Sequence, residues 1–266
     1  MQINLDIRKT VEQNASVYFD KSKKAKKKIE GIKKALSKFE RDKEEMLKKK
    51  EKAVSKEEEK IEIKKEKAKN RRAKKWYEKF RWFISSEGIL CIGGRDATTN
   101  EIIIKKHTDK DDIVFHTEAP GSPFFVLKIE DKKAGEATLK EAAQATAIYS
   151  RAWKMGLASA LVYWIKPEQV SQKTQSGEYM PKGSFMIYGK RNHSEPILEM
   201  AVGILPDGRV MGGPVNAVKK NCGKIIVLVQ GKNKKSDIAK KIKKEINGDL
   251  DDIISCLPPG EFQIRK

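Results

Sequence analysis

The stretch from residue 32 to residue 87 contains no glycine and no proline. Apolar or small residues recur at alternating spacings of four and three positions, at Val11, Ala15, Tyr18, Ser22, Ala25, Ile29, Ile32, Leu36, Phe39, Lys43 and Met46. This repeat is typical of a coiled-coil seam, although Ser22 and Lys43 interrupt it. The pattern predicts a long helix over 11–75, on the order of 100 Å in length if it is unbroken.

So narrow a seam needs a partner, and three partners are compatible with the pattern. Ser55-Lys56-Glu57-Glu58 resembles a capping box, so a break there would let 55–75 fold back on the first arm. The partner helix could instead belong to a second copy of the chain, which would make a homodimer. It could also belong to a missing N-terminal portion of the protein.

The positive charge is concentrated at the N-terminal end. The chain has a formal net charge of +20, and residues 1–75 hold 27 Lys/Arg against 14 Asp/Glu. Such a balance favours nucleic acid as the partner, with an anionic membrane surface second. The segment KSKKAKKK is poor in acids, so we expect Lys23, Lys24, Lys26, Lys27 and Lys28 to contact phosphates. Arg71 and Arg72 form a second basic patch.

The remaining composition points to an intracellular protein. Cys91, Cys222 and Cys256 lie far apart, which favours neither a disulfide framework nor a cysteine-rich zinc site. No run approaches the roughly 18 apolar residues that span a bilayer. We therefore expect a cytoplasmic protein with no membrane partner, no metal and no cofactor.

From Trp76 onward the sequence shows short strands and turns. Strands are predicted near 82–86, 89–93, 101–106, 112–117, 124–129, 158–165, 184–189, 197–204, 208–211 and 224–230, and helices at 136–154, 214–221, 236–246 and 249–256. Asp207-Gly208 is a hairpin signal. We therefore predict the α+β class: a basic coiled-coil arm over 1–75, then a mainly antiparallel sheet domain with packed helices over 76–266.

The motif HTEAPGSP, residues 116–123, combines a histidine with a serine in a turn. Catalysis by Ser122 would need His116 as a base, oriented by an acid such as Glu118 or Asp112. There is no GxSxG motif, and Ser122 lies between glycine and proline, which suits a rigid turn. We rank three roles for this motif: a turn that recognises a ligand comes first, a purely structural turn second and a catalytic site third.

Other loops offer donors for phosphate or ribose. GGRDATTNE, between two predicted strands, contributes Arg95 and Asn100, and its glycines permit a close backbone approach. Lys190 and Arg191 follow another predicted strand. Together with Gly121 and Lys128, these residues are candidate contacts to the phosphate or ribose of RNA. The alternative interpretation is that they lie in solvated loops without a binding role.

Several motifs together are more specific than any one of them. WYEKFRWFISSEGILCIGGRDATTNE, HTEAPGSP, KGSFMIYGKRN and GPVNAVKK, in this order, resemble the NFACT-R domain of the NFACT (RqcH/NEMF-like) family over about 76–230. The segment from Leu5 to Leu36 is similar to the distal arm of that family's coiled coil, and LDDIISCLPPG is similar to the ending of archaeal members.

The resemblance implies binding to the large ribosomal subunit at stalled translation complexes, tRNA recruitment and mRNA-independent extension of the nascent chain. The family's NFACT-N and helix-hairpin-helix domains and its first coiled-coil arm do not match any part of this sequence, so the resemblance assigns no peptide tailing to this chain.

We therefore predict a non-enzymatic RNA-binding module whose partners are large-subunit RNA and tRNA. A DNA-binding NFACT-R module and a nucleic-acid-processing enzyme using His116 remain alternatives.

Overall fold

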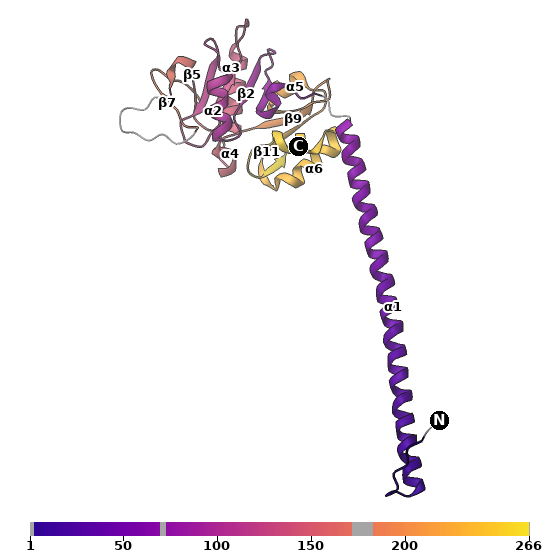
Figure 1. The fold of residues 1–266 in the computed structure, drawn as a ribbon. Coiled ribbons are helices and arrows are strands. Elements are labelled where there is room, and N and C mark those ends of the chain that lie inside the picture. The colour runs from indigo at the N-terminus through magenta and orange to yellow at the C-terminus, as the bar shows by residue number, and fades with distance from the viewer. Residues whose placement is uncertain (1–2, 70–72, 172–182, 266) are drawn as a thin grey trace, which may run out of the picture. The chain divides into compact units, whose positions relative to one another are not determined.

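A computed structural model describes residues 3–69, 73–171 and 183–265 (Figure 1). The chain divides into two compact units, Met1–Ala73 and Lys74–Lys266. Arg71 and Arg72 lie outside the described residues. None of the described helices is long and apolar enough to cross a membrane.

The first unit is built on the helix α1 (Val11–Lys69), which Figure 1 shows as one rod. Its beginning is fixed by reciprocal capping: the Gln13 N–H donates to Thr10 Oγ1 over 3.2 Å, and the Thr10 N–H donates to Gln13 Oε1 over 3.1 Å. The buried Asn14 holds the preceding segment, because its Oδ1 accepts from the Asp6 N–H and its Nδ2 donates to the Asp6 carbonyl.

α1 continues through residue 55 to Lys69, so the predicted alternative of a break at Ser55 is wrong. No glycine or proline is present there to end the helix, and a serine with helix-forming neighbours is tolerated inside one. The seam side chains Ile29, Ile32, Leu36 and Phe39 are 54% to 70% exposed. The first unit therefore carries an apolar stripe that its own residues do not cover.

We expect the isolated chain to self-associate through this stripe, since association would remove the four side chains from water. Sedimentation equilibrium should find a species larger than a monomer. The double variant Ile32→Asp, Leu36→Asp should be monomeric. Lys33→Asp, Ser37→Asp adds acids beside the stripe and should leave association unchanged. A monomeric wild-type chain would contradict the prediction.

The second unit contains two larger antiparallel sheets. The first has the order β1 (Arg81–Ile84), β2 (Leu90–Gly93), β4 (Phe125–Leu127), β3 (Ile113–Thr117), β5 (Val162–Ile165) and β8 (Asn192–Ser194). The second has the order β10 (Val210–Pro214), β9 (Met200–Ile204), β11 (Ile225–Asn233) and β12 (Phe262–Ile264). β6 (Val170–Ser171) pairs with β7 (Met186–Ile187). The hairpin predicted at Asp207-Gly208 is confirmed, because it joins the antiparallel strands β9 and β10.

Helices pack between and around the sheets. They are η1 (Trp76–Lys79), α2 (Ala97–Lys106), α3 (Glu136–Ile148), α4 (Arg151–Met155), η2 (Pro167–Gln169), α5 (Val215–Asn221), α6 (Lys235–Ile246) and α7 (Leu250–Cys256). α3 contacts β3, β4 and β5 of the six-stranded sheet and β10 of the four-stranded sheet. The α+β class is therefore confirmed.

Both faces of the six-stranded sheet are buried. One face carries Phe83 and Phe125 into the main core shared with the second sheet. The other face carries Val114 and Val126 into a smaller core, which Ile103 of α2 completes. This arrangement follows from the alternation of side chains along a strand.

The strand predicted at 101–106 is wrong, because these residues lie in α2. The run of three isoleucines favours a strand locally, but Asp96 caps a helix by accepting the Thr99 N–H over 2.8 Å. The helix predicted at 136–154 is divided into α3 and α4, since Ser150 caps the second helix through the Ala152 N–H. β6, β8 and β12 were not predicted.

Candidate nucleic-acid interface

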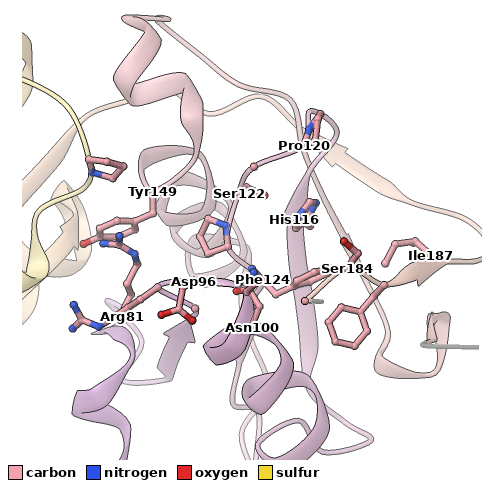
Figure 2. Close-up of a pocket in the computed structure, with 18 of the residues that line it drawn as sticks. Arg81, Asp96, Asn100, His116, Pro120, Ser122, Phe124, Tyr149, Ser184 and Ile187 are labelled. Carbon is pink, nitrogen blue, oxygen red and sulfur yellow. Dashed lines mark hydrogen bonds between the residues drawn. The ribbon is translucent and has the colours of Figure 1, made fainter. Parts of the chain in front are cut away.

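A cavity of about 520 Å³ lies at one end of the strands of the six-stranded sheet, between the start of α2, the 120–124 loop and the 183–187 segment (Figure 2). Its lining includes five residues predicted to bind RNA: Arg95, Asn100, His116, Gly121 and Ser122. These residues come from the β2–α2 loop, from α2, from β3 and from the loop that follows β3. The fold therefore brings together candidates that are separated in the sequence.

Arg95 is held in place by backbone carbonyls. Its guanidinium donates to the carbonyls of Lys79, Phe80 and Ser255 over 2.9 to 3.0 Å. The side chain thus ties η1 to the end of α7. Its donors are largely used inside the protein, while its positive charge remains at the cavity wall.

Asn100 fixes the 120–124 loop against α2. Its Oδ1 accepts from the Phe124 N–H over 3.1 Å. Residue 94 must be glycine, because a Cβ there would lie 1.8 Å from this oxygen. Gly121 has a φ of +97°, and a Cβ there would lie 2.4 Å from Arg151 Nε. The loop geometry is therefore defined before any ligand arrives.

His116 lies on β3, within the strand predicted at 112–117, and the predicted turn follows it. Its Nδ1 is 2.7 Å from the Thr117 carbonyl oxygen, and its ring lies 4.4 Å from the Phe124 ring. Burial lowers the pKa of His116, against the opposing effect of hydrogen bonds to the backbone of Thr117 and Ser122. The imidazole is therefore neutral at pH 7.

The residues considered for a catalytic triad are engaged elsewhere. Ser122 Oγ accepts from the Thr117 N–H over 3.1 Å. Glu118 contacts Arg191 Nη1 and His193 Nε2, each over 2.7 Å. Asp112 is paired with Lys128. Neither candidate acid is thus hydrogen-bonded to His116 among the contacts of the described residues.

Lys128 is the buried partner of two acids. Its side chain is 7% exposed, and its Nζ lies 2.6 Å from an Asp109 oxygen and also contacts Asp112. Lys190 lies in an exposed loop, and Arg191 covers the Tyr163 ring at 4.7 Å. None of the three predicted contacts Lys128, Lys190 and Arg191 lines the cavity.

Arg81 lines the cavity and was missed in the sequence. Its guanidinium lies 4.3 Å from the centre of the Tyr149 ring, and Figure 2 shows the two side chains together. Burial lowers the pKa of Arg81, and the charge of Arg95 acts in the same direction. The signal in the sequence that could have identified Arg81 was its position between the aromatic residues Phe80 and Trp82.

The lysines predicted to bind phosphate on α1 are exposed. None of Lys23, Lys24, Lys26, Lys27 and Lys28 forms an ion pair within the part of the chain that the structure describes. By contrast, Lys34, Lys48 and Lys49 each lie within 3.6 Å of a glutamate four positions earlier. The 21–28 segment therefore carries a cluster of lysines whose charge no carboxylate of the described residues neutralises by an ion pair.

Residues 79–189, which contain most of the cavity lining, match the NFACT protein RNA binding domain. The chain belongs to the NFACT family. It is 42% identical to the Archaeal Rqc2 homolog aRqcH of Methanocaldococcus jannaschii over 74% of this chain and 30% of that protein.

Two animal relatives match over shorter shares of their length. The Ribosome quality control complex subunit NEMF homolog of Drosophila melanogaster is 35% identical over 71% of this chain and 18% of its own length. The Ribosome quality control complex subunit NEMF of Homo sapiens is 42% identical over 47% of this chain and 12% of its own length. The chain thus spans less than a third of the length of these relatives.

Proposed function

We propose that this chain is the RNA-binding module of a ribosome-associated quality-control factor that works in the cytoplasm. The match of residues 79–189 to an RNA-binding domain carries the proposal. The names of the relatives, which describe ribosome quality-control proteins, supply the setting. The unpaired lysines of α1 supply charge suited to phosphate.

The two units take different RNA partners in this proposal. The basic arm α1 contacts RNA of the large ribosomal subunit, and the second unit contacts tRNA. The module is not an enzyme. Support for that part comes from Glu118, which is paired with Arg191 and His193, and from Ser122, whose Oγ accepts from the backbone.

Co-sedimentation with purified large ribosomal subunits tests the first partner. Competition between tRNA and duplex DNA of equal length tests the second, because phosphate contacts alone do not distinguish RNA from DNA. We expect the chain to pellet with the subunits and tRNA to compete better. Equal competition would favour the DNA-binding alternative.

His116→Ala should leave the fold intact and lower tRNA affinity by at most about tenfold. A neutral imidazole contributes roughly 0.5–1.5 kcal/mol through its hydrogen bonds. Loss of a catalytic base would instead reduce a rate by about a hundredfold to ten-thousandfold with little effect on binding. Filter binding and gel analysis of tRNA integrity separate the two outcomes.

His193→Ala is the matched control, since His193 lies on β8 and does not line the cavity. It should bind tRNA as the wild type does. If the wild type cleaves or modifies tRNA and His116→Ala binds tRNA without doing so, the non-enzymatic assignment is wrong.

A further inference from the structure

The cavity is lined by a guanidinium that has one buried nitrogen without an acceptor in the described part of the chain. Nη1 of Arg81 is buried and has no hydrogen-bond partner among the described residues. In the same part of the chain no carboxylate lies within ion-pair distance of Arg81. Such a group is costly to bury unless it is paired. An anionic oxygen bound in the cavity would supply the missing partner.

Other cations lie close to Arg81. The charge of Arg95 acts to lower the pKa of Arg81. Lys235, whose Nζ donates to the Leu257 carbonyl over 2.8 Å, has its pKa lowered by burial and then by the charge of Arg81. Among the cavity-lining residues Asp96 carries the one carboxylate, which accepts from the Thr99 N–H. The Arg81 end of the cavity is therefore positive and suits a phosphate.

The other end of the cavity is aromatic. The Phe124 ring lies 5.3 Å from the Phe185 ring in an edge-to-face arrangement and 4.4 Å from the neutral His116 ring. Figure 2 shows His116 and Phe124 on the side of the cavity away from Arg81 and Tyr149. Phe124 is only 4% exposed, whereas His116 and Phe185 are partly exposed. The His116 and Phe185 rings are therefore the ones on which a nucleobase can stack.

The spacing between the two ends is fixed by close packing. Gly183 has a φ of +78°, and a Cβ there would lie 2.6 Å from Ala97 Cα, so the segment with Ser184 and Phe185 lies tightly against α2. The volume of about 520 Å³ falls within the range of roughly 300–1,000 Å³ that is usual for pockets holding small organic ligands.

We propose that this cavity binds one unpaired nucleotide, with its phosphate at Arg81 and Arg95 and its base against His116 and Phe185. The inference rests on the proposed RNA-binding function, because an RNA strand is the expected source of the nucleotide. A base inside a duplex is stacked and paired, so a single-stranded segment or a strand end is required. A free mononucleotide has the same chemistry, and the experiment distinguishes the two sources.

The test uses two variants of the full chain and two matched controls. Arg81→Gln removes the unpaired charge, and Ser184→Trp fills the cavity from an exposed position on its lining. Arg265→Gln removes an arginine outside the lining, and Ser184→Thr changes the same position by little. The probes are a labelled single-stranded RNA of about eight nucleotides, a blunt RNA duplex of the same length, and AMP and UMP.

Each cavity variant should lose roughly tenfold in affinity for the single strand. Affinity for the duplex should be unchanged, and both controls should behave as the wild type. Single-strand binding at wild-type strength in both cavity variants would overturn the inference, as would an equal loss for the duplex. Circular dichroism and thermal melting establish that the variants fold. If Arg81→Gln does not fold, the affinity of Ser184→Trp for the single strand tests the inference.

Failure of the proposed function gives a different result. A wild-type chain that binds neither RNA probe, tRNA nor ribosomal subunits would remove the RNA-binding proposal. Saturable binding of AMP or UMP that both cavity variants lose would then retain the cavity as a site for free nucleotides. If the mononucleotides also fail to bind, the cavity inference is overturned as well.

Discussion

Changing Lys23, Lys24, Lys26, Lys27 and Lys28 together to glutamate is expected to weaken binding to large-subunit RNA by about a hundredfold or more at 0.1 M salt. Each lysine that neutralises a phosphate releases counterions, so log affinity falls with log salt with a slope of about 0.7 to 0.9 per contact. Loss of five contacts should therefore flatten the slope by about 3.5 to 4.5. Titrations at several salt concentrations measure both effects.

A charge-matched variant makes this prediction specific to position. Changing Lys33, Lys34, Lys38, Lys48 and Lys49 to glutamate alters the net charge of α1 by the same amount. Three of these lysines already pair with glutamates, so they have less charge to offer to phosphates. We expect a smaller loss of affinity and a smaller change in slope. An unchanged slope in the 23–28 variant would make the arm a spacer.

The long helix could be predicted from the sequence because its causes are local. The absence of glycine and proline and the seam spacing both act within a few residues. The 101–106 segment shows the limit of such reasoning. Three isoleucines favour a strand locally. The segment is nevertheless a helix, because Asp96 caps its beginning and Ile103 packs in the smaller core.

The cavity was predicted in part. Polar residues and glycines in the loops directed attention to Arg95, Asn100, His116 and Gly121, which all line it. Which donors remain available to a ligand depends on contacts between distant residues. The carbonyl of Ser255 takes up a donor of Arg95, whereas Arg81 is left with a buried nitrogen that has no partner among the described residues. Sequence spacing carries no signal for such pairings.

Lys128 illustrates the same limit, because its surroundings favour a role other than the predicted contact with RNA. Burial acts to lower the pKa of Lys128, but the hydrogen bonds and charges of Asp109 and Asp112 outweigh this effect and raise it. A raised pKa means that the pairing stabilises the fold throughout the neutral range and is lost as the pH rises through that pKa. A phosphate would have to displace acids that already satisfy the ammonium.

Lys128→Met is therefore expected to lower the free energy of unfolding by about 3–5 kcal/mol, because it leaves the buried Asp112 charge without its partner. Urea unfolding at pH 7 measures the loss. The double variant Lys128→Met, Asp112→Asn should recover much of it, since a neutral amide can still accept from the Ile129 N–H. Lys190→Met, in an exposed loop, should have little effect on stability. If Lys128 contacted phosphate instead, Lys128→Met would reduce RNA affinity and the salt slope while stability stayed near that of the wild type.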